Sequence, residues 1–111
     1  MKIYISIPIS GYDLDTQTAK AMSLVEKIEA LGHEAINPFD TQLAPVEWSE
    51  KKKYSYYMGE DLKTLLNCDA LLMAEPGCVV SKGCMLEFQA AKIYGLHVFA
   101  KVEDLPQQDF I

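Results

Sequence analysis

The chain has 111 residues, of which 50% are hydrophobic and 23% charged, and its formal net charge is −6. This composition is typical of a globular protein, and the length predicts one domain over residues 1–111. The negative charge argues against binding to polymeric nucleic acid or to an anionic membrane surface, and no apolar run approaches the roughly 20 residues of a membrane span.

The cysteines and histidines follow no metal-binding pattern. Cys68, Cys78 and Cys84 form an odd set without a Cys-x-x-Cys pair, and their spacing to His33 and His97 matches no zinc motif. We therefore predict no metal. Buried, reduced thiols are the plain interpretation, which indicates a cytoplasmic protein.

The first half of the chain predicts strand, helix and strand in turn. Residues 2–7 are rich in isoleucine and predict a buried first strand, too short and too alternating for a signal peptide. Pro8 begins a loop, and apolar positions at helical spacing predict a helix over residues 15–31, with Gly32 at its end. Residues 34–36 predict a short second strand.

The second half repeats this alternation after a long loop. Residues 37–53 are irregular and hold the only tryptophan, Trp48. An irregular stretch of this length is typical of a lid or binding loop. Helix, strand, helix and strand are then predicted over residues 54–66, 69–73, 82–94 and 97–100. The polar tail from Lys101 is expected to form a partial strand or a loop.

This order of elements predicts an α/β fold: a three-layer sandwich with a flavodoxin/Rossmann-like, mostly parallel sheet of four to five strands. Ligands of such sheets bind beyond the carboxyl ends of the strands. The loops expected at that edge are residues 8–14, 37–53 and 74–81.

The stretch from Ser81 to Glu87 combines two features of a binding site. Ser81 is a good N-cap for the following helix, and Gly83 allows close approach to the backbone, where free N–H groups suit an anion such as phosphate. Helical spacing places Glu87 with Gly83 and Cys84 on the apolar face that should pack on the sheet. A carboxylate in that position must be compensated.

Asp61 is a second acidic candidate, because it borders the apolar stripe of its own helix. Two carboxylates near one cleft suit glycosyl transfer, in which one attacks the anomeric carbon and the other handles a proton. The alternative is that Glu87 and Asp61 are solvated or ion-paired helix residues.

Other candidates carry weaker signals. Ser10 and Gly11 suit a phosphate-binding turn, and Tyr4 suits either a site residue or a core tyrosine. We expect Asp69 to bond nearby backbone N–H groups, and residues 51–53, three consecutive lysines, to be a solvated helix start.

Five motifs follow one another in a fairly specific order: Lys2-Ile3-Tyr4-Ile5-Ser6, Pro8-Ile9-Ser10-Gly11, Glu60-Asp61-Leu62, Cys68-Asp69-Ala70-Leu71-Leu72 and Ser81-Lys82-Gly83-Cys84-Met85-Leu86-Glu87. Together these motifs resemble the nucleoside 2-deoxyribosyltransferase-like superfamily, and the resemblance covers most of residues 1–100. This superfamily includes nucleoside deoxyribosyltransferases, nucleoside 5′-monophosphate N-glycosidases and short uncharacterised relatives, to which the chain is most similar.

The resemblance implies a role for each matching residue. Glu87 matches the nucleophile that attacks C1′, Asp61 the acid that assists at the sugar and base, and Tyr4 the tyrosine that orients the nucleophile. Ser81 matches a position that is serine in the monophosphate N-glycosidases, which favours a 5′-phosphate. The residues expected to bind substrate are Ser6, Ser10, Gly11, Trp48, Ser81 and Gly83.

The chain also departs from the family pattern. Its first loop lacks the arginine or glycine pair of some N-glycosidases, and after the fourth strand it lacks the segment with which deoxyribosyltransferases complete a neighbour's site. We therefore expect hydrolysis rather than transfer.

The sequence thus predicts an N-glycosidase or (deoxy)ribosyltransferase that acts on a small nucleoside or nucleotide through Glu87, without a cofactor, and the resemblance implies a dimer or larger homo-oligomer. Two alternatives stay open. One is a non-catalytic nucleotide-binding module of the same fold, and the other is an interaction domain that uses residues 48–57.

Overall fold

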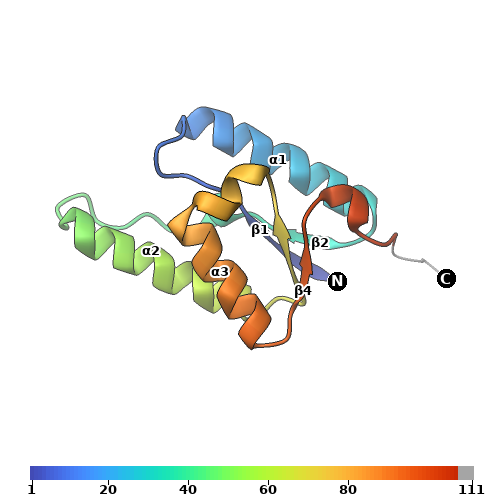
Figure 1. The fold of residues 1–111 in the computed structure, drawn as a ribbon. Coiled ribbons are helices and arrows are strands. Elements are labelled where there is room, and N and C mark those ends of the chain that lie inside the picture. Colours follow the sequence, from blue (N-terminus) through green and yellow to red (C-terminus); the bar gives the residue numbers. More distant parts are fainter. Residues whose placement is uncertain (108–111) are drawn as a thin grey trace.

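The computed structural model describes residues 1–107, and over this range strands and helices alternate along the chain (Figure 1). The strands are β1 (Lys2–Ser6), β2 (Glu34–Ile36), β3 (Ala70–Met73) and β4 (His97–Phe99). The helices are α1 (Leu14–Ala30), α2 (Glu50–Leu65) and α3 (Lys82–Ile93), with short 3₁₀ helices η1 (Pro38–Asp40), η2 (Pro76–Val80) and η3 (Val102–Asp104). All described strand pairs are parallel, in the order β2-β1-β3-β4. The predicted α/β class and parallel sheet are confirmed.

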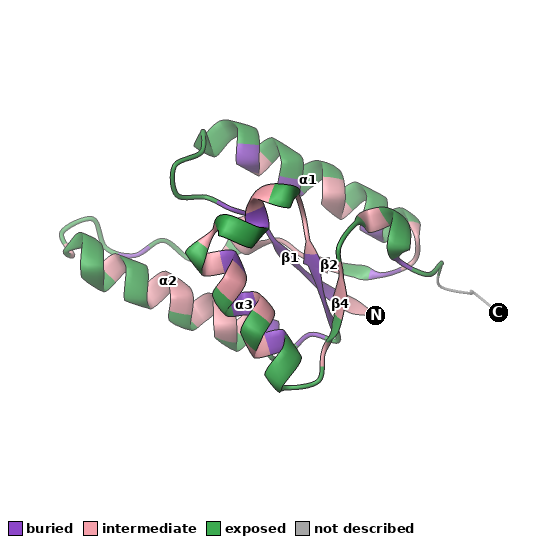
Figure 2. Ribbon diagram, in the orientation of Figure 1, coloured by how far each residue is buried: buried purple, intermediate pink, exposed green. Residues whose placement is uncertain are grey.

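The sheet lies between two helical layers, with α1 on one face and α2 and α3 on the other (Figure 1). Strand β1 alternates between the layers, since successive side chains of a strand point to opposite faces. The residues buried on the α1 side include Ile3, Ile5, Ile7, Ile28 and Leu72. Those buried on the opposite side include Tyr4, Leu65, Leu71 and Ala91. The buried residues therefore follow the strands and the inner helix faces (Figure 2).

Capping residues define the helix ends. Asp13 caps α1 by accepting a hydrogen bond from the Thr16 backbone N–H, and Ser81 caps α3 in the same way for Cys84. Gly95 follows α3 with φ +75°, a conformation that glycine adopts without strain. The predicted cap at Ser81 and the predicted end at Gly95 are confirmed.

One predicted helix start was wrong. Helix α2 begins at Glu50 rather than at residue 54, and Ser49 caps it by accepting from the Lys52 N–H. Its first turn is polar and solvent-exposed, so the apolar period used for the prediction starts one turn too late. The tail, expected to be a partial strand or a loop, forms the short 3₁₀ helix η3, with Leu105 buried. The last four residues of the predicted tail lie outside the described residues.

Asp69 lies at the start of β3 and accepts a hydrogen bond from the Lys2 N–H at 2.8 Å. It therefore bonds a backbone N–H as expected, although that N–H belongs to the neighbouring strand β1. Over residues 1–107, no helix combines the length and apolarity that crossing a bilayer requires.

Candidate active site

Glu87 lies on the face of α3 that packs against the sheet. Helical spacing places it with Cys84 and Ala91, and these three are the buried residues of the helix. Only 5% of the Glu87 surface is exposed. The carboxylate is thus buried, as the helical pattern predicts, and not solvated.

Two hydroxyl groups from β1 compensate this carboxylate. Tyr4 Oη donates to Glu87 Oε2 at 2.6 Å, and Ser6 Oγ donates to Oε1 at 2.7 Å. Tyr4 and Ser6 lie two positions apart, so both point from β1 toward the α2–α3 layer. Hydrogen bonds to a charged acceptor are short and strong, and both oxygens of Glu87 receive one.

Burial raises the pKa of Glu87 to about 7. The hydrogen bonds from Tyr4 and Ser6 lower this pKa, while the negative charge of Asp61 raises it further. Neither ion pair in the described part of the chain includes Glu87 or Asp61. The ion-paired alternative for these residues thus finds no support in residues 1–107.

Asp61 lies on α2, partly buried, and its charge raises the pKa of both Glu87 and Tyr4. Burial raises the pKa of Asp61 itself to about 6. Thr41, in the loop after β2, donates a long hydrogen bond of 3.4 Å to Asp61 Oδ1 and opposes this shift, whereas the charge of Glu60 adds to it. The two acids therefore form an interacting pair on facing helices.

Tyr4 is 1% exposed, and burial, followed by the charges of Glu87 and Asp61, raises its pKa far above the ordinary value. The phenol therefore keeps its proton and remains a donor to Glu87 across the physiological pH range.

Two hydroxyl groups at this site make contacts that the sequence does not predict. Ser6, a predicted substrate-binding residue, donates to Glu87, and Thr41, which no sequence pattern singles out, donates to Asp61. The signal for Ser6 was its spacing of two from Tyr4 on a strand. Thr41 lies in a loop that the sheet topology already placed at the ligand edge.

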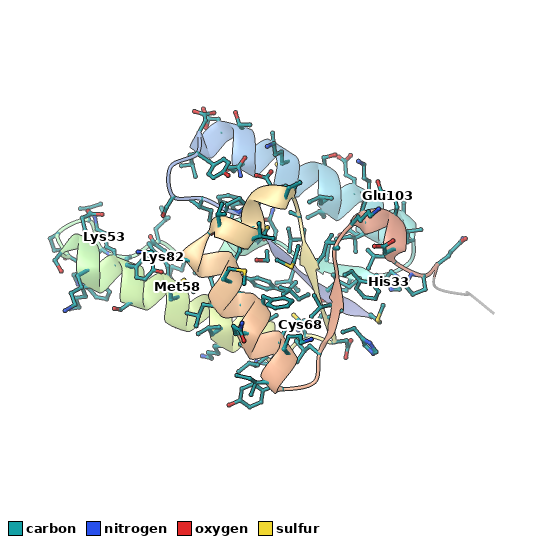
Figure 3. The ribbon with its side chains drawn as sticks, in the orientation of Figure 1. His33, Lys53, Met58, Cys68, Lys82 and Glu103 are labelled. Carbon is teal, nitrogen blue, oxygen red and sulfur yellow. The ribbon has the colours of Figure 1, made fainter. Side chains whose placement is uncertain are left out.

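The predicted anion-binding residues of α3, Ser81 and Gly83, already have contacts within the protein. The Ser81 side chain accepts from Cys84 N at 3.4 Å as the helix cap. A Cβ added to Gly83 would lie 3.6 Å from Met58 Sδ. The backbone of α3 at Gly83 therefore packs close to α2. Figure 3 shows Met58 on α2 beside the start of α3, where Lys82 lies. Lys82 is exposed.

The first loop carries Ser10 and Gly11, which are both exposed. Gly11 has φ +84°, so this turn needs a residue that tolerates the left-handed region. The adjacent Tyr12 packs with its hydroxyl group against Gly77 of η2, so closely that a Cβ at Gly77 would lie 2.4 Å from it. This contact joins the loop after β1 to the loop after β3.

Trp48 lies against the first turns of α2. Its ring meets Tyr56 edge to face with centroids 5.8 Å apart, and Lys52 Nζ lies 4.0 Å above it. Tyr57 Oη accepts from Ala44 N at 2.9 Å. The long loop thus packs on α2 through these contacts. Trp48 is not among the residues that donate hydrogen bonds to Glu87.

A polar cavity of about 470 Å³ opens between the edge strand β2, the loop after it and the side of α2 that carries Tyr56, Glu60 and Thr64. It reaches Thr41, the hydrogen-bond partner of Asp61. Its polar lining residues are Asn37, Asp40, Thr41, Gln42, Tyr56, Glu60 and Thr64. Within residues 1–107, no group of three or more His, Cys, Asp or Glu side chains is placed to hold a metal ion.

Comparisons with known proteins bear on the fold and the family of the chain. The structure is similar to that of a 2-deoxyribosyltransferase from the psychrotolerant bacterium Bacillus psychrosaccharolyticus, with a TM-score of 0.63 and 22% sequence identity over 100% of this chain and 77% of that chain. At this identity the likeness shows a shared fold, which is the fold implied by the resemblance. A search of curated proteins found no match. Residues 1–100 match the family described as domain of unknown function DUF4406, and the chain belongs to that family.

Proposed function

We propose that this protein cleaves the N-glycosidic bond of a nucleoside or nucleoside 5′-monophosphate through a covalent glycosyl-Glu87 intermediate. The observation that carries the proposal is the Glu87 carboxylate, buried under α3, held by Tyr4 and Ser6 and coupled to Asp61. A structural helix residue needs neither this burial nor these donors. Strongly shifted pKa values at buried, paired acids are typical of catalytic sites.

The chemistry assigns one task to each acid. Ionised Glu87 attacks C1′ of the sugar, a C–O bond forms as the C1′–N bond breaks, and the electron pair of that bond leaves with the base. Asp61, whose pKa of about 6 keeps part of it protonated near neutrality, transfers a proton to the departing base. Water then attacks C1′, and Asp61, now ionised, takes up a proton from it while Glu87 is released.

Tyr4 and Ser6 act as positioning residues in this scheme. Their donors fix both carboxylate oxygens and leave one lone pair of each oxygen free. Because Tyr4 does not ionise, it holds Glu87 in one orientation without competing for the proton. The polar cavity beside Thr41 offers donors and acceptors suited to the edge of a base.

The resemblance to monophosphate N-glycosidases at Ser81, and the exposed Lys82 next to it, support a 5′-phosphate on the substrate. The chain contains no arginine, so any phosphate must be held by lysine, hydroxyl and backbone N–H groups. A substitution can separate the two roles of Ser81. Aspartate is as good an N-cap as serine, but its charge repels a phosphate. We expect Ser81→Asp to keep the fold and base release from nucleosides, and to lose release from 5′-monophosphates.

The direct test is the release of free base, measured by chromatography, from a panel of nucleosides and 5′-monophosphates. We expect release by the wild type, a loss of about a thousandfold or more in Glu87→Gln, and no change in Glu26→Gln, an exposed α1 residue that serves as the matched control. Tight binding of a nucleotide without base release would instead identify a non-catalytic binding module and contradict the proposal.

A further inference from the structure

Two buried thiols that the proposed mechanism does not use lie together behind Glu87. Cys78 in η2 is 0% exposed and Cys84 in the first turn of α3 is 1% exposed. Only Ser81 separates the two elements. Its N–H donates to Cys78 O at 3.3 Å, and its hydroxyl group accepts from Cys84 N at 3.4 Å. Ser81 thus links the two elements, and the two thiols lie close enough for each to shift the pKa of the other.

Both thiols also contact Ser6, which holds the proposed nucleophile. Cys78 Sγ donates to the Ser6 carbonyl oxygen at 3.3 Å, and the Cys84 thiol interacts with the Ser6 hydroxyl group. Ser6 in turn donates to Glu87 Oε1. Cys84 lies one helical turn before Glu87 on the same buried face of α3. A covalent change at the thiol pair therefore acts on both ends of the Ser6–Glu87 hydrogen bond.

The surroundings of the two thiols shift their pKa values in opposite directions. The interaction with Cys78, and next the hydrogen bonds with Ser6 and Ser81, lower the pKa of Cys84 to about 6 against the opposing effect of burial. The interaction with Cys84 and burial raise the pKa of Cys78. A thiolate beside a protonated thiol is the arrangement in which one sulfur is oxidised first and the other resolves it.

We propose that Cys78 and Cys84 are a redox-sensitive pair that closes to an intramolecular disulfide when a hydroperoxide oxidises the protein. Cys84 attacks the terminal oxygen of the hydroperoxide, becomes a sulfenic acid and reduces the oxidant to water or an alcohol. Cys78 then attacks the Cys84 sulfur, the S–O bond breaks, water leaves and the S–S bond forms. The two electrons given up by the thiols are those gained by the hydroperoxide.

Access to the pair runs through η2. This five-residue 3₁₀ helix has no side-chain cap, and its Val79 and Val80 are 65% and 81% exposed. Short 3₁₀ segments have poorer hydrogen-bond geometry than α-helices and open more readily. Opening η2 exposes Cys78, and a hydroperoxide, which is scarcely larger than water, can then reach Cys84.

The disulfide is tested on the full chain by mass spectrometry, after hydrogen peroxide treatment and alkylation of the remaining thiols under denaturing conditions. Cleavage with trypsin and an Asp-specific protease places each cysteine on its own peptide, since cuts before Asp69 and after Lys82 separate Cys68, Cys78 and Cys84. We expect peptides 69–82 and 83–92 to be cross-linked and to separate after reduction with dithiothreitol. Cys68→Ala is the control and keeps the cross-link, whereas Cys78→Ala abolishes it.

Cross-links through Cys68, or both thiols of the pair still free in excess peroxide, would overturn the proposal. The effect on catalysis rests on the proposed function and is a separate readout. We expect oxidation to lower base release by about tenfold or more, since small displacements of a catalytic group have effects of that size, and dithiothreitol to restore it. If reduced protein releases no base, the proposed function fails while the cross-linking result stands on its own.

Discussion

At the scale of single residues, the site depends on opposing effects on Glu87. Burial favours the neutral acid, and the nearby charge of Asp61 does the same, whereas the hydroxyl groups of Tyr4 and Ser6 favour the carboxylate. Burial prevails, so the pKa of Glu87 rises from 4.5 to about 7. A group poised near neutrality is ionised often enough to act as a nucleophile and is less solvated than a surface carboxylate.

The first prediction concerns the titration of this pair. In carboxyl-¹³C NMR of labelled protein we expect Glu87 to titrate near its pKa of about 7, well above the exposed glutamates. Asp61→Asn removes a negative charge beside Glu87 and should move this titration to lower pH. Because Asp61→Asn also removes the proposed proton donor, kcat/KM falls in this variant, and the rising limb of its residual activity should shift in the same direction. A Glu87 signal that titrates with the surface glutamates, or that ignores Asp61→Asn, contradicts the described site.

The second prediction concerns stability. The pKa of Glu87 is higher in the folded state than its ordinary value of 4.5, so between these two values the folded state binds more protons than the unfolded state. The free energy of unfolding therefore falls as pH rises through this interval. Near pH 8 we expect Glu87→Gln to be more stable than the wild type by about 1 to 3 kcal/mol, with a flatter pH dependence in urea unfolding. Equal stability of the two proteins at that pH would show that ionised Glu87 is not destabilising.

At the scale of elements, the helices show which boundaries a sequence reveals. Apolar periodicity, together with the N-cap residues and the glycines that follow the helices, located α1 and α3 within about one residue. It missed the first turn of α2, whose residues Glu50 to Lys53 meet solvent, although Ser49 followed by polar helix formers was a usable cap signal.

The third prediction compares the substitution of glycine by alanine at Gly59 and at Gly95, which differ in backbone conformation but not in the space around them. A Cβ at Gly59 or at Gly95 would meet nothing within 4 Å, but Gly95 has φ +75° whereas Gly59 lies inside α2. We expect Gly59→Ala to raise the free energy of unfolding by about 0.5 to 1 kcal/mol and Gly95→Ala to lower it by about 1 to 2 kcal/mol. Chemical denaturation measures both, and shifts of equal sign would contradict these backbone assignments.

At the scale of the whole molecule, the alternation of strand and helix was enough to predict a parallel sheet. Helical spacing was enough to predict that Glu87 faces the sheet. Contacts between distant segments were not predictable, because Ser6 and Glu87, or Thr41 and Asp61, meet only through the packing of separate elements. The same holds for Gly83, whose neighbour Met58 belongs to another helix.

The core has two layers, one on each face of the sheet, and Glu87 lies in only one of them. Ile28 is fully buried on the α1 side of the sheet, opposite the layer that holds Glu87. We expect Ile28→Val to lower the free energy of unfolding by about 0.5 to 1.5 kcal/mol and to leave the titration of Glu87 unchanged. Thermal unfolding and the ¹³C titration check this expectation. A shift of the Glu87 titration in this variant would show that the two layers are coupled.

The most direct measurement is mass spectrometry of protein quenched during base release from a substrate analogue whose glycosyl-enzyme hydrolyses slowly. Tryptic peptide 83–92 holds a single carboxylate side chain, that of Glu87. We predict that this peptide gains the mass of one sugar residue in the wild type and in Glu26→Gln, and that Glu87→Gln gains none. Rapid base release with that peptide unmodified, or with the sugar on another residue, would contradict the central claim that Glu87 is the nucleophile.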